Sequence, residues 1–159
     1  MSEPKVCIII PVHNSMPHLQ DAIASLLTST DYKHYRIILV ESESTDGTDE
    51  YCDMLEIAHP HISVIHTKKE GITKAINTGL RNMTSDEDAY LTQDDVIHFR
   101  LYNRDWLEFL ARTASEDNNI GILTTLDAGG ICEGPEYIKD FHWVGTWSMY
   151  IPRRTIQKL

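Results

Sequence analysis

Apolar residues along this chain fall into short runs that alternate with stretches of helical periodicity. Residues 5–11 (Lys-Val-Cys-Ile-Ile-Ile-Pro) and 35–40 (Tyr-Arg-Ile-Ile-Leu-Val) are rich in β-branched side chains, as expected of strands that are buried on both faces. Between them, apolar residues recur every three or four positions, which predicts an amphipathic helix. Its core face consists of Leu19, Ile23, Leu26 and Leu27.

The same alternation continues through the rest of the chain. Further strands are predicted at residues 62–66, 88–91, 120–123 and 143–151, the last interrupted at Gly145. Further helices are predicted with core faces at Met54, Leu55 and Ala58, at Ile72, Ala75, Ile76 and Leu80, and at Trp106, Leu107, Leu110 and Ala114. Glycine and polar residues after Leu126 predict a long loop, and residues 155–159 resemble the start of a helix. This order predicts an α/β, Rossmann-like, mostly parallel sheet with helices on both faces.

The size and the charge of the chain narrow the range of possible functions. The chain of 159 residues has the length of one domain, and its net charge of −10 argues against nucleic-acid binding. No apolar run is long enough to span a membrane, and the first residues lack the layout of a signal peptide, so we expect a cytoplasmic protein. The odd number of cysteines (Cys7, Cys52 and Cys132), without zinc spacing, fits a reducing compartment.

Three polar loops follow predicted strands: residues 11–14, 41–48 and 92–96. The carboxyl ends of parallel strands line one crevice, where ligands bind in α/β sheets. The adjacent carboxylates of Asp94 and Asp95 repel each other, so they need open water or a compensating charge. A divalent cation that carries a phosphate-bearing ligand would supply that charge. A solvated acidic turn is the alternative.

Together these loops resemble the family 2 glycosyltransferases of the GT-A fold. The matching stretches are P-V-H-N at 11–14, E-S-E-S-T-D-G-T at 41–48, G-I-T-K-A-I-N-T-G at 71–79, Q-D-D-V at 93–96, and H-W-V-G-T with M-Y-I-P-R-R at 142–146 and 149–154. They occur in the family's order over essentially the whole chain. The resemblance implies transfer of a sugar from a nucleotide-diphosphate donor to a glycan or lipid-linked acceptor, with inversion and with a divalent cation (Mn²⁺ or Mg²⁺). Contact with the inner face of a membrane is compatible with such acceptors.

The resemblance also implies site residues. It places the nucleotide sugar against Pro11, Val12, His13, Asn14, Glu41, Ser42, Gly71, Lys74 and Asp94. Asp95 would be the principal metal ligand, together with Asp94, and Trp143 and Gly145 would lie on the acceptor side. Residues 1–97 would form the nucleotide-binding half of a single domain and residues 98–159 the start of the acceptor half.

The chain also departs from the family pattern. Ser42 stands where uridine-using members read the base with an aspartate, and Thr92 stands where many members have a further aspartate. The acidic residue that serves as catalytic base in the family would follow Leu159, so no catalytic residue is assigned and the chain is expected to be a C-terminally truncated domain. Two alternatives remain open. One is a nucleotide-sugar-binding module without turnover. The other is a phosphoacceptor domain, which is disfavoured because the first strand ends without a nucleophilic aspartate.

Overall fold

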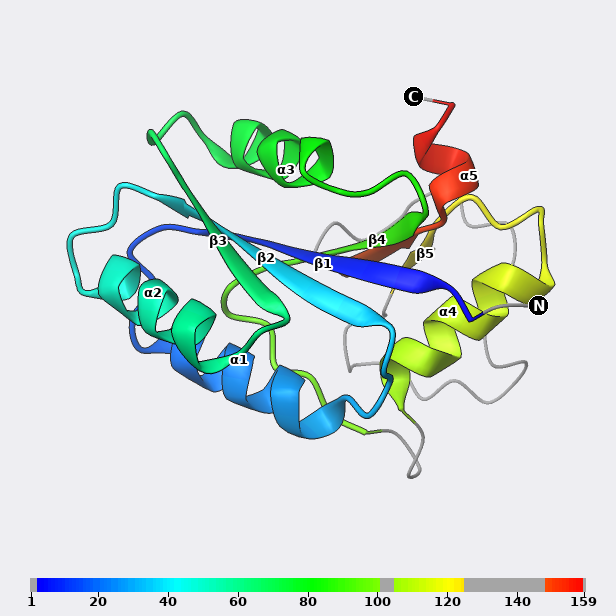
Figure 1. Ribbon diagram of the computed structural model, residues 1–159, viewed down its shortest axis with the longest axis horizontal. Coiled ribbons are helices and arrows are strands. Elements are labelled where there is room, and N and C mark those ends of the chain that lie inside the picture. Colours follow the sequence, from blue (N-terminus) through cyan, green and yellow to red (C-terminus); the bar gives the residue numbers. More distant parts are fainter. Residues whose placement is uncertain (1–2, 101–104, 125–147, 159) are drawn as a thin grey trace.

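The computed structural model describes residues 3–100, 105–124 and 148–158, which form a six-stranded sheet with helices on both faces (Figure 1). The strands are β1 Lys5–Val12, β2 Tyr35–Ser42, β3 Ile62–Thr67, β4 Glu87–Thr92, β5 Leu123–Thr124 and β6 Ser148–Ile151, and the helices are α1 His18–Ser29, α2 Thr48–Ala58, α3 Ile72–Arg81, α4 Trp106–Glu116 and α5 Arg153–Ile156. The strand order is β3-β2-β1-β4-β6-β5. The first four strands pair in parallel, and β6 is antiparallel to both β4 and β5. The predicted fold class is confirmed.

Apolar side chains form one core on each face of the sheet. On β1, Ile8 and Ile10 join α1, α2 and α4, whereas Cys7 and Ile9 join α3 and α5. Figure 1 shows the same two helical layers, with α3 and α5 on one side of the sheet and the other helices on the opposite side. Successive strand residues point to opposite faces, so a central strand flanked by two layers needs the uninterrupted apolar run that β1 has.

Two of the predicted helix faces are wrong in part. Met54 is 61% exposed and Ala58 is also exposed, and the core side of α2 consists of Cys52 and Leu55. Met54 is adjacent to Leu55 in sequence, which places it about 100° around the helix and out of the core. Ile72 is 54% exposed because it begins α3 at the edge of the sheet.

Three predicted boundaries also change. The strand predicted at residues 120–123 is reduced to Leu123–Thr124, and α5 begins at Arg153 rather than Thr155. Only the end of the strand predicted at residues 143–151 is seen, as β6, because residues 143–147 lie outside the described residues. The division of the chain at residue 97 stays a prediction.

The last helix is tied to the end of α4 by one arginine. The Nη2 of Arg154 donates to the carbonyl oxygens of Ala114, Asp117 and Ile120, at 3.0, 3.0 and 2.7 Å. Carbonyl groups at the end of a helix have no partner within it, and a cation is favoured there. Arg154 therefore fixes α5 and β6 against α4.

An ion pair bridges β2 and β4 at the amino ends of the parallel strands. Arg36 donates from Nε and Nη2 to the two carboxylate oxygens of Glu87, at 2.6 and 2.9 Å. Glu87 is 6% exposed and also accepts the Thr84 N–H at 2.8 Å. A bidentate pair with these additional contacts is strongly oriented.

The packing of α3 on β1 depends on a glycine. A Cβ at Gly79 would lie 2.4 Å from Cγ2 of Ile9, a fully buried side chain. We expect Gly79→Ala to lower the free energy of unfolding by about 1–3 kcal/mol, the usual cost of overpacking a core. Urea denaturation measures this, with Asn77→Ala on the exposed side of the same helix as the control. Equal midpoints for the two variants would contradict the close packing.

Candidate functional site

The loops after β1 and β2 are fastened together at the carboxyl edge of the sheet. Thr45 N–H donates to Oδ1 of Asn14 at 2.7 Å. Three N–H groups of the first loop donate to side chains of the second: Asn14 to Ser44 Oγ, Ser15 to Thr48 Oγ1 and Met16 to Asp46 Oδ2, at 3.0, 3.1 and 3.1 Å. The segment from Ser44 to Thr48 therefore fixes the geometry of the edge at which ligands bind in α/β sheets.

Glu41 uses both of its carboxylate oxygens within the protein. Oε1 accepts the Ser44 N–H at 2.6 Å, and Oε2 lies 3.0 Å from Nδ1 of His66, whose Nε2 lies 2.9 Å from Asp53. Burial alone would raise the pKa of Glu41, but the hydrogen bonds from Ser44 and His66 hold it below its usual value. Glu41 thus holds the β2–α2 loop in place and does not line the pocket described below.

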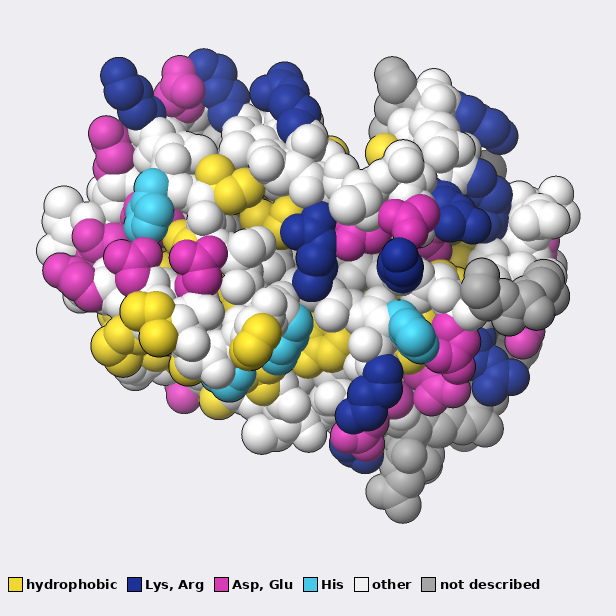
Figure 2. Space-filling model, viewed as in Figure 1, with side chains coloured by type: hydrophobic (Ala, Val, Ile, Leu, Met, Phe, Trp, Pro, Cys, Tyr) yellow, Lys and Arg dark blue, Asp and Glu magenta, His cyan; other side chains and the backbone are white. Residues whose placement is uncertain are grey.

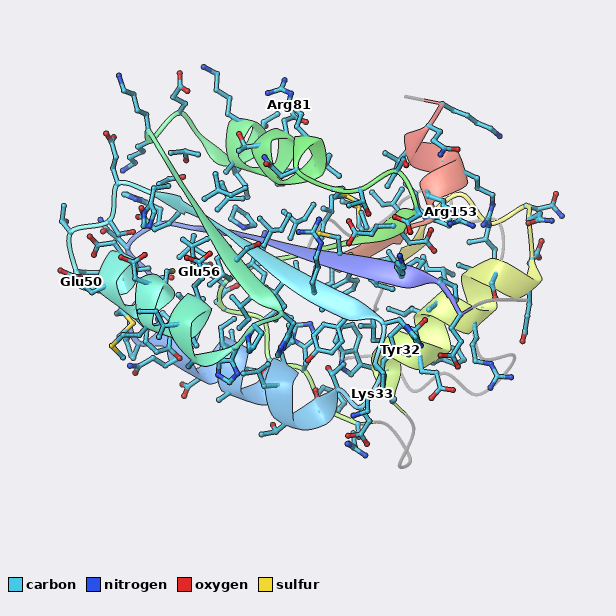
Figure 3. The ribbon with its side chains drawn as sticks, viewed as in Figure 1. Tyr32, Lys33, Glu50, Glu56, Arg81 and Arg153 are labelled. Atoms are coloured by element: carbon cyan, nitrogen blue, oxygen red, sulfur yellow. The ribbon has the colours of Figure 1, made fainter. Side chains whose placement is uncertain are left out.

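His66 lies within an acidic surface. Acidic side chains gather over α2 and the loop before it (Figure 2), and Glu50 and Glu56 extend from α2 (Figure 3). Hydrogen bonds to Glu41 and then Asp53 raise the pKa of His66 above its ordinary value. Hydrogen bonds to carboxylates from both ring nitrogens therefore favour the protonated form of the His66 imidazole.

The raised pKa of His66 predicts that the stability of the fold depends on pH. Because its pKa is raised on folding, its stabilising contribution is complete below about pH 6.5 and is lost as the pH rises through the raised pKa. An NMR titration of the His66 ring should give a pKa above 6.5 that falls in Asp53→Asn. Glu116→Gln, on α4, should leave it unchanged. An unshifted His66 in the unmodified chain would contradict the bridge.

A pocket of about 310 Å³ opens between the carboxyl edge of the sheet and the start of α3. Its volume falls at the lower end of the range for small-molecule sites. The lining residues are Pro11, Val12, His13, Ser42, Lys69, Gly71, Ile72, Ala75, Gln93 and Asp94. Loops that are far apart in the sequence thus converge on one cavity, as the strand-end rule predicts.

His13 and Ser42 meet at the corner of this pocket formed by β1 and β2. Nδ1 of His13 lies 2.6 Å from the Ser42 carbonyl oxygen. A carbonyl only accepts, so Nδ1 carries the hydrogen. The Ser42 hydroxyl lies 3.0 Å from the Thr67 hydroxyl, which in turn donates to the Glu41 carbonyl at 3.1 Å. Both pocket residues are therefore held by neighbouring strands.

The carboxylate pair lies at the opposite side of the pocket from β2. Asp94 is partly buried and Asp95 is exposed. Burial raises the pKa of Asp94; the Ser15 side chain and the His13 backbone oppose that rise, and the nearby charge of Asp95 adds to it. A bound cation would offset both the desolvation of the Asp94 carboxylate and its repulsion by Asp95.

The residues fit a cation that is shared with a phosphate-bearing ligand. Among residues 3–100, 105–124 and 148–158, no cluster of three or more histidine, cysteine or acidic residues could hold a metal by itself. Mg²⁺ in enzymes is commonly held by one or two carboxylates, with substrate phosphates and water completing the shell. Asp94 and Asp95 supply that number. Thr92, which stands where the resemblance implies a further aspartate in many members, is buried and hydrogen-bonded to Ser148 at 3.0 Å.

The structure sorts the predicted site residues into three groups. Those that line the pocket are Pro11, Val12, His13, Ser42, Gly71 and Asp94. Asn14, Glu41, Lys74 and Asp95 do not line it: Asn14 and Glu41 hold the loops, Lys74 pairs with Glu70, and Asp95 is exposed beside the pocket. Trp143 and Gly145 lie outside the described residues. The contacts of all these residues with a ligand stay predictions.

The pocket is also lined by four residues that the predicted site does not include: Lys69, Ile72, Ala75 and Gln93. Lys69 follows β3, so the rule used for the other three strand ends would have found it. Gln93 lies in a matched stretch, but the resemblance implies no role for it. The amphipathic spacing of Ile72 and Ala75 predicts core positions for both, so it does not point to the pocket.

The position of the pocket at the ends of parallel strands is that of the α/β domains that bind their ligands at the carboxyl edge of the sheet. The chain belongs to glycosyl transferase family 2, whose sequence model matches residues 7–159. The predicted family is confirmed. Within the described part of the chain, no helix has the length and apolar character needed to cross a membrane.

Individual relatives agree with this assignment. The chain is 31% identical over 114 residues to glycosyltransferase GlyA of Streptococcus pneumoniae, covering 72% of the chain and 16% of GlyA. It is 28% identical over 117 residues to the uncharacterized glycosyltransferase YibD of Escherichia coli, covering 74% of the chain and 32% of YibD. The chain therefore spans less than a third of the length of these relatives.

Two solved structures share the fold. The mannosyltransferase PcManGT of Pyrobaculum calidifontis, in complex with GDP-Man and Mn²⁺, has a TM-score of 0.68 at 25% identity, covering 79% of this chain and 36% of that one. TarS 1-349 of S. aureus has a TM-score of 0.71 at 17% identity, covering 97% of this chain and 48% of that one.

Proposed function

We propose that this chain is the donor-binding part of a glycosyltransferase that moves a sugar from a nucleotide-diphosphate donor to a glycan or lipid-linked acceptor. The observation that carries the proposal is the convergence of His13, Ser42 and Asp94 on one pocket at the carboxyl edge of the sheet. Family membership supports the chemistry of sugar transfer. Inversion at the anomeric carbon is proposed from the resemblance.

A divalent cation, Mn²⁺ or Mg²⁺, belongs to this proposal. Asp95 would be its principal ligand and Asp94 a second one, with the donor diphosphate completing the shell. When bound, the cation would stabilise the charge that develops on the diphosphate leaving group. The Mn²⁺ in the PcManGT complex supports this reading, as does the pKa of Asp94, which is raised by burial and by Asp95.

We further propose that transfer takes place in the cytoplasm, at the inner face of the membrane when the acceptor is lipid-linked. Cys7 and Cys52 are both free and buried, which is compatible with a reducing compartment. Within its described residues the structure contains no helix of membrane-spanning character. Any contact of this chain with lipid is proposed to be peripheral.

Calorimetric titration with UDP, GDP, CDP and dTDP, in Mn²⁺ or in EDTA, tests donor binding. We expect at least one nucleotide to bind in Mn²⁺, and removal of the metal to weaken it by at least about tenfold because the diphosphate then faces two uncompensated carboxylates. Equal affinity in Mn²⁺ and in EDTA would contradict the metal site. Absence of binding to every nucleotide by the folded chain would contradict the donor site itself.

A second assay separates a transferase from a binding module without turnover. The complete gene product is incubated with the sugar nucleotide selected by the titration and with a glycan or lipid-linked acceptor. Release of the nucleoside diphosphate that depends on the acceptor is expected of the transferase. Tight binding with no release for any acceptor would favour the binding module.

A further inference from the structure

The charges of the helices are divided between the two faces of the sheet. α2 has four acidic residues and no lysine or arginine, whereas α3 has one lysine, one arginine and no acidic residue. On the α2 side, α1 has a single acidic residue and α4 has two, against one arginine. On the α3 side, α5 adds Arg153 and Arg154. The helices of one face are thus acidic and those of the other are basic.

The cations of α3 and of the turn before it face solvent. Figure 2 shows Lys and Arg side chains along the outer side of α3, and Figure 3 shows that Arg81 points away from the strands. Lys68, Lys74 and Arg81 are exposed, and we call these three residues the basic face. Lys74 pairs with Glu70, but neither Lys68 nor Arg81 forms an ion pair with another described residue. The basic face therefore has charge available for a partner.

The net charge of −10 does not cancel the basic face. Exposed charges interact over about one Debye length, which is about 8 Å at physiological ionic strength. α2 packs on the opposite face of the sheet from α3, and a helix alone is about 10 Å across. A surface that approaches α3 therefore meets its cations and is screened from the acidic side of the molecule.

The spacing of the basic face fits an extended anionic surface. Lys74 and Arg81 are two turns apart on the same side of α3, about 10 Å along its axis, which is wider than one phosphate group. Cations in such a row can contact several headgroups of an anionic leaflet at once. Ile72, which is 54% exposed at the start of α3, adds an apolar side chain that can enter the headgroup boundary.

We propose that the basic face docks this chain on a membrane surface of anionic lipids, and that docking directs the pocket to lipid-linked acceptors rather than to soluble glycans. The pocket opens at the start of α3, and Ile72 belongs both to its lining and to the exposed end of the helix. An acceptor held at the lipid surface is therefore presented beside the pocket. The assignment of the acceptor rests on the proposed function, whereas the docking itself does not.

Sedimentation with lipid vesicles tests the docking. The 159-residue chain is mixed with vesicles of phosphatidylcholine, either alone or with about one third phosphatidylglycerol. We expect the anionic vesicles to bind the chain at least about 25-fold more tightly than the neutral ones, and this preference to fall as the salt concentration rises. Equal binding to the two kinds of vesicle would overturn the proposal.

Neutralising the two unpaired cations tests the basic face. Each lysine or arginine near an anionic surface contributes about fivefold to binding, so Lys68→Gln/Arg81→Gln should weaken binding to the anionic vesicles by about 25-fold. Lys33→Gln/Arg112→Gln is the matched control: it changes the net charge equally, but Lys33 follows α1 and Arg112 lies on α4 (Figure 3). The control should bind the vesicles as the unmodified chain does. Equal losses in the two variants would overturn the basic face as the docking surface, because binding would then follow net charge alone.

The docking and the donor site can fail separately. Nucleotide binding in Mn²⁺ by a folded chain that binds no vesicles would overturn the docking and leave the donor site in place. Vesicle binding that requires Lys68 and Arg81, without binding of any nucleotide, would support the docking and overturn the proposed function. Binding of soluble polyphosphate through the same two cations, without binding to vesicles, would overturn the lipid surface in favour of a soluble polyanion.

Discussion

Asp95→Asn is expected to weaken Mn²⁺-dependent nucleotide binding by more than about 100-fold. Loss of a partner that merely orients a metal ligand typically costs about 10- to 100-fold, and here the ligand itself loses its charge. Asparagine keeps the size of the side chain, and Asp95 is exposed, so the fold should be unaffected. Isothermal titration with the nucleotide that binds the unmodified chain measures the change.

Glu116→Gln is the matched control for this experiment. It removes the same charge from an exposed position on α4, where the carboxylate lies 3.8 Å from Arg112. Its nucleotide affinity should equal that of the unmodified chain. If Asp95→Asn also bound nucleotide normally in Mn²⁺, Asp95 would not be the principal metal ligand and the acidic pair would be a solvated turn.

Glu87→Ala is expected to lower the free energy of unfolding by about 2–4 kcal/mol. The variant leaves the guanidinium of Arg36 without its bidentate partner, and the cost is reduced from that of a fully enclosed pair because Arg36 is 30% exposed. Chemical denaturation measures it. The exposed Lys5–Asp86 pair nearby provides the control, since Asp86→Ala should be much less destabilising. If Glu87→Ala and Asp86→Ala were equally destabilising, the burial of Glu87 would add nothing to the stability that its ion pair provides.

The Arg36–Glu87 pair also predicts that the stability of the fold depends on pH. Burial on its own would raise the pKa of Glu87, but hydrogen bonds from Arg36 and from the Thr84 backbone hold it below its usual value near 4.5. A pKa lowered on folding contributes stability that is complete above the usual value and is lost as the pH falls through the lowered one. The unmodified chain should therefore lose more stability than Glu87→Ala between about pH 5 and pH 3.

The strands of this fold were predictable because their burial on two faces leaves a continuous apolar run. The face of α2 was less predictable, since Cys52, Met54, Leu55 and Ile57 form two overlapping stripes and only the position of the helix over β2 and β3 selects between them. The short β5 was overpredicted because Ile120 and Gly121 continue the apolar pattern beyond the two residues that pair with β6.

The convergence of the strand ends on one pocket was predictable from one geometric rule, but the contacts of the individual residues were not. Strand ends brought His13, Ser42 and Asp94 to the same pocket as predicted. The partner of Glu41 is His66, which lies opposite it only because of the register between β2 and β3. Nothing local to either residue specifies that register, so the sequence pattern could not show that the Glu41 carboxylate is already occupied.

The pairing of β5 with β6 fixes the positions of Thr124 and Ser148 relative to each other. Leu123 pairs with Tyr150 and Thr124 with Met149, and the Thr124 hydroxyl donates to the Ser148 carbonyl at 3.0 Å, so Thr124 and Ser148 hold adjacent positions in the sheet. Closing a longer loop between such fixed points costs only about 0.6 kcal/mol for each doubling of its length. Residues inserted between two anchored positions of this kind are therefore expected to cost little stability and to leave the strands that line the pocket unchanged.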